Sequence, residues 1–210
     1  MLLRTSIAML MLVCATAHAE VKVDWARGLV TADAVGVADR HAPNPAVARG
    51  TSRRGAEDAA KKLLAAKVGE LPVAGGSTVA AKAKDKAVKE RIERAVANAI
   101  TLAADPETDG AWKVTLAVPI EAVRQAIAGP RALPADGDKG PVVVVVDSAT
   151  AKPAVGWTIA GVEAPVLWVT DVPAWAKDAP HATAKGAKGG AIEVTGIDAS
   201  AATLFVVVTK

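Results

Sequence analysis

Cysteine is nearly absent from this chain of 210 residues, which has a single one, Cys14. One thiol cannot form an intramolecular disulfide, so a disulfide-stapled scaffold is excluded. Histidine is also scarce, and only His41 and His181 lie beyond residue 19. A structural zinc site needs about four cysteine or histidine ligands. The residues beyond position 19 therefore exclude that class of metal site.

Large aromatic side chains are rare as well, with no tyrosine, one phenylalanine (Phe205) and five tryptophans. The hydrophobic fraction nevertheless reaches 51%, and it consists mostly of alanine and valine. Such a fraction is typical of a globular chain and excludes disorder throughout. The tryptophans must then supply nearly all of the aromatic area in the core or at an interface.

Excess charge of one sign is missing too. The formal net charge is +3, and +2 without residues 1–19, which contain Arg4 and no acidic residue. This excess is too small to indicate binding to nucleic acid or to an anionic membrane surface. No apolar run beyond residue 19 approaches the roughly 18 residues that span a bilayer, so we expect no transmembrane helix.

One apolar stretch does stand out, at the beginning of the chain. Arg4 precedes an apolar run from Ile7 to Ala15, and Ala17-His18-Ala19 comes just before Glu20. A charged start, a short apolar core and a small-x-small site are typical of a secretory signal peptide. We therefore expect cleavage after Ala19 and a location in the periplasm or outside the cell.

Lipid attachment at Cys14 is the alternative fate of this segment. A lipoprotein signal needs a small residue directly before the cysteine, and here that residue is Val13. Because Ala17-His18-Ala19 already offers a conventional cleavage site, we expect no lipid anchor. Association with the outer membrane would then be peripheral.

Two helices are expected in the first half of the chain. Asn44-Pro45 is a good helix start, and an apolar stripe follows at helical spacing to about Val68, with Gly69 as the C-cap. The second helix is expected from about Asp85 to Ala104, because apolar residues recur there at helical spacing. They are Val88, Ile92, Val96 and Ile100, with Ala95, Ala99 and Ala103 beside them.

Strands are expected on both sides of these helices. Gly28 to Val37 is rich in β-branched and small residues, and Ala111 to Val118 alternates strictly. Pro72 to Thr78 is expected to hold a short strand and turn, and Ile120 to Ala128 a third, short helix. Two main helices packed on a small, mostly antiparallel sheet make an α+β domain over residues 20–128.

The pattern changes after a segment rich in glycine and proline, Gly129 to Gly140, which we interpret as a linker. Residues 141–210 are expected to form a β-rich C-terminal unit, with Ala184 to Gly190 as a flexible loop. The predicted strands are Val142–Asp147, Ala154–Ala160, Val166–Thr170, Ala191–Thr195 and Thr203–Thr209.

Catalytic and metal-binding groupings are weak. His41 and His181 lie in predicted loops beside proline, and either would meet Ser52 or Ser148 only through the tertiary fold. Asp136, Asp138 and Asp147 match no calcium-loop spacing, so a polar linker is favoured over a metal site. We accordingly predict no catalytic residues, no metal and no cofactor.

Two further segments favour ordinary structure over binding. Gly75-Gly76-Ser77-Thr78 lacks the lysine and spacing of a phosphate loop, which favours a plain turn. The basic residues from Lys82 to Arg94 could contact phosphates or lipopolysaccharide, but acidic residues alternate with them. A solvated helix face is the favoured interpretation.

Three tryptophans of the C-terminal unit, Trp157, Trp168 and Trp175, lie within nineteen residues of one another. They could line a ligand groove or an interaction surface, where tryptophan is enriched. The alternative is that they fill the volume of an alanine- and valine-rich core, and packing favours this second interpretation.

The order of motifs in the first half resembles a known pattern. An extended segment, Gly28–Gly36, leads to Asn44–Arg49 (NPAVAR) and then to Arg53–Leu64 (RRGAEDAAKKLL). Trp25 to Val118 thereby resembles bacterial envelope proteins of the LPP-twenty lipoprotein type, and the helix is similar to one in the N-terminal domain of flagellar assembly protein T. The chain departs from the pattern at Gly50, Gly55 and Ala59-Ala60 and in its missing lipidation motif.

The resemblance implies an envelope-located α+β domain, sometimes built into rings around surface machines, and it implies no catalytic residues. Together with the signal segment, it predicts a non-enzymatic envelope protein with a structural or assembly role. Its expected partners are itself or other envelope proteins. The alternative hypothesis is a periplasmic binding module that holds a glycan or peptide on the Trp-rich C-terminal unit.

Overall fold

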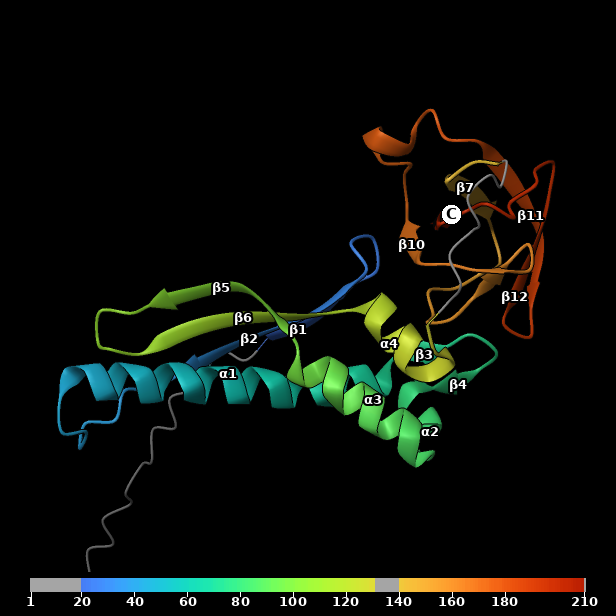
Figure 1. The fold of residues 1–210 in the computed structure, drawn as a ribbon. Helices are drawn as coiled ribbons and strands as arrows, with labels where there is room; N and C mark the ends of the chain where they lie inside the picture. Colours follow the sequence, from blue (N-terminus) through green and yellow to red (C-terminus); the bar gives the residue numbers. More distant parts are fainter. Residues whose placement is uncertain (1–19, 131–139, 210) are drawn as a thin grey trace, which may run out of the picture.

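A computed structural model describes residues 20–130 and 140–209 (Figure 1). The predicted signal peptide and most of the predicted linker lie outside these residues. The described chain is of the α+β class, with a four-stranded sheet and four helices up to Ala128, and a seven-stranded sheet after Gly140. We call the first part the arm and the second the C-terminal unit.

The sheet of the arm is antiparallel throughout, in the order β1-β2-β6-β5. Its strands are β1 (Glu20–Asp24), β2 (Leu29–Gly36), β5 (Ile100–Pro106) and β6 (Trp112–Pro119). Alternate residues of β2 and β6, such as Val30, Ala32, Val114 and Leu116, are buried on one face. This alternation follows from the period of two in a strand, and it confirms the predicted half-buried strands.

Helix α1 (Pro45–Glu70) covers that buried face along its length (Figure 1). Asn44 caps its N-terminus as predicted, because its side-chain oxygen accepts a hydrogen bond of 2.9 Å from the backbone N–H of Val47. Every fourth residue from Ser52 to Val68 is buried against the sheet. Gly69 lies inside the helix and Leu71 is the C-cap, so the predicted cap position was wrong by two residues.

Three shorter helices and a hairpin complete the arm. They are β3 (Pro72–Val73), β4 (Ser77–Thr78), α2 (Val79–Lys82), α3 (Lys86–Ala97) and α4 (Ile120–Ala128). The hairpin confirms the strand and turn predicted after α1. Helix α3 packs against α4 and α1, and its Ile92 and Val96 join the core of the arm.

The predicted second helix was wrong in its C-terminal third. Helix α3 ends at Ala97, and Ile100 to Pro106 forms the edge strand β5. Ile100 continues the four-residue apolar spacing of Val88, Ile92 and Val96, but it pairs with Ala117 of β6 instead. Long-range pairing with β6 overrides the local helical pattern.

The C-terminal unit has one mixed sheet in the order β10-β13-β7-β11-β12-β8-β9. Its strands are β7 (Val143–Ser148), β8 (Thr158–Ile159), β9 (Val162–Glu163), β10 (Val166–Val169), β11 (His181–Lys188), β12 (Ala191–Thr195) and β13 (Leu204–Thr209), with a 3-10 turn η1 (Ala174–Ala176) after β10. β10, β13, β7 and β11 run parallel to one another. Most of the predicted loop Ala184–Gly190 is strand, because β11 pairs with β12 as far as Lys188 and only Gly189-Gly190 turns.

Both faces of the central strands β7 and β13 are buried. Val144, Val146 and Phe205 face one apolar cluster, whereas Val145 and Val206 face a second one that includes Ala176. Burial on both faces explains why these segments are continuous valine runs and do not alternate with polar residues.

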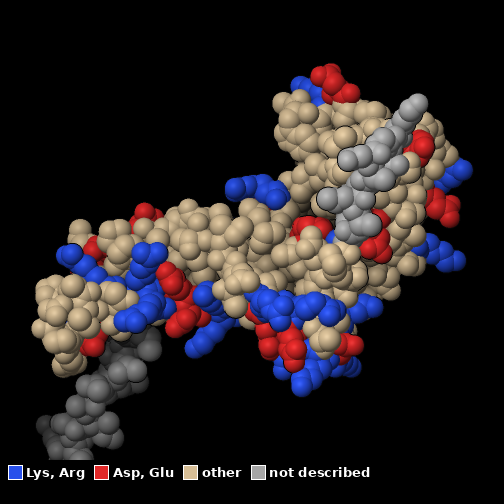
Figure 2. All heavy atoms as spheres, in the orientation of Figure 1, with Lys and Arg blue, Asp and Glu red and all other residues tan. Residues whose placement is uncertain are grey.

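The C-terminal unit stands at one end of the elongated arm, so that the molecule has an L-shaped outline (Figures 1 and 2). Backbone hydrogen bonds join the two parts, from Trp168 N–H to the Trp25 carbonyl (3.1 Å) and between Val155 and the β3–β4 hairpin. Trp25 contacts both cores, and Val155 is buried in the core of the arm. No helix within residues 20–130 and 140–209 is long and apolar enough to cross a membrane.

Candidate functional site

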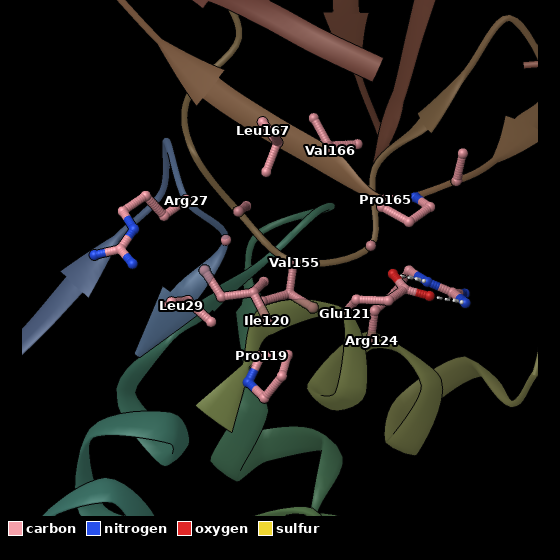
Figure 3. A pocket seen from close by; sticks show the side chains of 14 residues that line it. Arg27, Leu29, Pro119, Ile120, Glu121, Arg124, Val155, Pro165, Val166 and Leu167 are labelled. Carbon is pink, nitrogen blue, oxygen red and sulfur yellow. Dashed lines mark hydrogen bonds and ion pairs between the residues drawn. The ribbon is translucent and has the colours of Figure 1, made fainter. Parts of the chain in front are cut away.

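A pocket of about 220 Å³ lies at the junction of the arm and the C-terminal unit (Figure 3). Leu29 and Ile120 line it from the arm, and Pro165 to Leu167 line it from the C-terminal unit. Arg27 extends on one side and the Glu121–Arg124 pair lies on the other (Figure 3). The pocket is therefore mainly apolar, with charged groups at its two sides.

Arg124 is the one buried charged side chain among the described residues, with 4% of its surface exposed. It donates two hydrogen bonds of 2.8 Å to the Glu121 carboxylate, one turn earlier on α4. A third contact of 3.5 Å reaches Glu163 on β9 of the C-terminal unit. Hydrogen bonding to Glu121 raises the pKa of the Arg124 guanidinium above its usual value. The arginine stays charged, so it needs its acidic partners.

Replacing Glu121 by glutamine is expected to lower the free energy of unfolding by about 2 kcal/mol, since a buried cation loses its bidentate partner. The loss is smaller than for a fully buried pair because Glu163 remains within reach. Chemical denaturation followed by circular dichroism measures it. Glu90→Gln is the matched control, since Glu90 and Lys86 form an exposed pair at 3.9 Å worth well under ~1 kcal/mol. Equal losses in the two variants would contradict the assigned role of Arg124.

The three tryptophans proposed as an interaction surface do not form one surface. Trp157 and Trp168 are 9% and 4% exposed, and their rings pack at 6.2 Å between centroids inside the C-terminal core. Only Trp175, on η1, is largely exposed, at 59%. The alanine- and valine-rich core takes up two of the three rings because few other large side chains are present to fill it.

The catalytic and metal candidates also lie apart. Ser52 is buried and donates a hydrogen bond to the Gly36 carbonyl, whereas His41 is exposed in the loop before α1. His181 approaches Asp147 at 3.7 Å across the parallel pair β7 and β11, but Ser148 accepts from the backbone of Ala151. Asp136 and Asp138 lie outside the described residues. Among those residues, no group of three or more histidine, cysteine or acidic side chains is placed to hold a metal ion.

The glycine-rich segment Gly75–Thr78 contributes its two glycines to the lining of a second, shallow pocket. Gly75 and Gly76 turn the β3–β4 hairpin with φ values of +91°, and Gly75 faces the Gly189-Gly190 turn of the C-terminal unit. Trp157 lines the same pocket of about 360 Å³. The sequence correctly predicted a turn here, but not its contact with the other glycine turn.

Arg124 was missed at the sequence level. Its signal is a Glu-x-x-Arg pair within a short apolar helix, where an i,i+3 ion pair can form. Similar pairs are common on exposed helix faces, and the sequence does not show that Glu163 of the C-terminal unit lies 3.5 Å from this one.

Comparison of the chain with models of known protein families gives no match, and neither does comparison with curated proteins.

Proposed function

We propose that this protein is a secreted, non-enzymatic component of the cell envelope that assembles by pairing of its arm with a second copy. The signal segment at residues 1–19 and the resemblance of Trp25 to Val118 to ring-forming envelope domains support the location and the role. The single observation that carries the proposal is the free edge of the arm sheet at β5.

β5 is the last strand of the sheet, so within residues 20–130 and 140–209 the backbone groups on its outer side have no neighbouring strand. Ile100 and Leu102 on this strand are 50% and 45% exposed. An exposed edge strand with apolar side chains is a template for pairing with another strand. The opposite edge, β1, carries the charged residues Glu20 and Lys22, which disfavour such pairing. Pairing through β5 would extend the sheet from one copy into the next.

Lysine at both Ile100 and Leu102 is expected to abolish assembly, because two cations on the edge oppose strand pairing. Light scattering after size exclusion, over a concentration series, measures the oligomeric state. The wild-type protein should increase in mass with concentration, and the double variant should remain monomeric.

Val142→Lys provides the matched control, because Val142 is 60% exposed on the C-terminal unit, away from β5. This variant should assemble like the wild type. A wild-type protein that stays monomeric at the highest reachable concentration would reject the self-assembly. An intact mass of the secreted protein that does not correspond to a chain beginning at Glu20 would reject the predicted cleavage.

A further inference from the structure

A second surface feature, distinct from β5, lies where α1, α2 and α3 converge. These three helices enclose an open groove of about 680 Å³. The small, exposed residues Ala65 and Ala80 form part of its surface, and the buried side chains Val79, Ile92 and Val96 lie directly beneath. The groove is therefore lined mainly by methyl groups and is open to solvent.

Positive charge borders this groove. Lys61 and Lys62 of α1 line it, and neither has an acidic partner among the described residues. Lys89 and Glu93 of α3 also line it, but they approach each other at 3.8 Å and so offset one another. The border thus has an excess of two unpaired ammonium groups. On this part of the arm, Figure 2 shows basic side chains gathered together, with acidic ones among them. An occupant with an anionic group complements this border.

The length of the groove restricts its occupant. Along α1 it extends from Lys61 to Gly69 and along α3 from Lys89 to Ala97, which is about 12 Å at the helical rise. A partner helix would make only about two turns of contact, which is small for a stable protein–protein interface. A flexible alkyl chain of medium length needs no such ordering. The volume also lies within the range of small-molecule sites.

We propose that this groove binds a free fatty acid, with the alkyl chain against Ala65, Ala80 and the exposed edge of Ile92, and the carboxylate beside Lys61 and Lys62. The apolar lining removes the chain from water, and the two ammonium groups hold the charged end. The site does not include β5, so fatty-acid binding and self-assembly can be tested separately.

Isothermal titration of the full protein with dodecanoate, below its micelle-forming concentration, tests the site. Ala65→Trp fills the groove from an exposed position, and Ala66→Trp places the same side chain on the neighbouring exposed position outside it. We expect one dodecanoate per chain, a loss of affinity of at least tenfold in Ala65→Trp, and no change in Ala66→Trp. The double variant Lys61→Gln/Lys62→Gln should bind about tenfold more weakly, from the loss of charged hydrogen bonds.

Dodecyl maltoside has the same alkyl chain with a neutral head group and should bind at least tenfold more weakly than dodecanoate. Equal affinity for the two ligands, or equal effects of the two tryptophan variants, would overturn the proposal. Absence of dodecanoate binding, together with a change in oligomeric state in Ala65→Trp alone, would also overturn it and identify the groove as a contact between copies.

Discussion

Alanine at Gly36 is expected to lower the free energy of unfolding by about 3 kcal/mol, through overpacking between the sheet and its covering helix. Gly36 ends β2 directly beneath α1. A Cβ atom there would lie 1.9 Å from the Ser52 carbonyl oxygen and 2.8 Å from the Ala56 nitrogen. Both atoms belong to the helix backbone, so no side chain can rotate away. Either α1 or the end of β2 must move, and the hydrogen bond from the Ser52 hydroxyl to the Gly36 carbonyl would be strained.

Gly50→Ala and Gly55→Ala test the same substitution where space is free. Both glycines are exposed on α1, and a methyl group at either position would have no atom within 4 Å beyond the helix's own backbone and the adjoining residues. Each alanine is expected to raise the free energy of unfolding by about 0.5–1 kcal/mol, since alanine favours the helix over glycine. Urea denaturation followed by circular dichroism compares the three variants. A Gly36→Ala protein as stable as the wild type would show that α1 does not lie this close to β2.

Local sequence was sufficient to predict features that lie within one helical turn or one strand. Asn44-Pro45 marks the start of α1, because a cap residue and an N-terminal proline act within a single turn. The alternation of Trp112 to Val118 predicted β6 and its buried face, because period two is a property of one strand. Features of this kind depend only on neighbours in the chain, and they gave the α+β class and most elements of the arm.

Local sequence failed where a distant strand decided the outcome. Ile100 fits the helical spacing of α3, yet it forms the edge strand that carries the proposed assembly surface. The segment from Lys185 to Lys188 is rich in glycine and lysine, yet pairing with Ala191 to Glu193 makes it part of β11. In both cases the partner strand supplies the backbone hydrogen bonds, and its register is not encoded within the segment itself.

The candidate surfaces were hidden for a related reason. The groove is formed by Lys61, Ala65 and Ile92, which come from two helices separated in sequence. Each helix alone has an ordinary solvated face with lysines, and that is how the basic stretch after Lys82 was interpreted. Only the packing of α2 and α3 against α1 leaves a methyl-lined opening between these three helices.

Replacement of Trp168 by alanine is expected to have the largest effect on the C-terminal unit, a loss of about 4 kcal/mol. The ring is 4% exposed and packs against Trp157 with an interplanar angle of 59°. Truncation leaves a cavity in a core built mostly from alanine and valine, which have no long side chains to refill it. The aromatic pair adds roughly 0.5–1.5 kcal/mol beyond the area it buries.

Trp168→Phe separates the contribution of the ring volume to stability from that of the indole N–H at the same position. The indole N–H of Trp168 is buried, and no described residue is placed to accept its hydrogen bond. Phenylalanine therefore removes an unsatisfied donor while it keeps most of the ring. We expect this variant to lose less than ~1.5 kcal/mol.

Trp175→Ala is the matched control, because Trp175 is 59% exposed on η1 and its truncation should change stability by no more than about 0.5 kcal/mol. Denaturation followed by far-UV circular dichroism measures all three variants without relying on tryptophan emission. Similar losses for Trp168→Ala and Trp175→Ala would mean that the two rings share one environment, as an interaction surface formed by all three tryptophans would require. A difference of several kcal/mol would instead assign Trp168 to the core and leave Trp175 as the one ring of the three available to a partner.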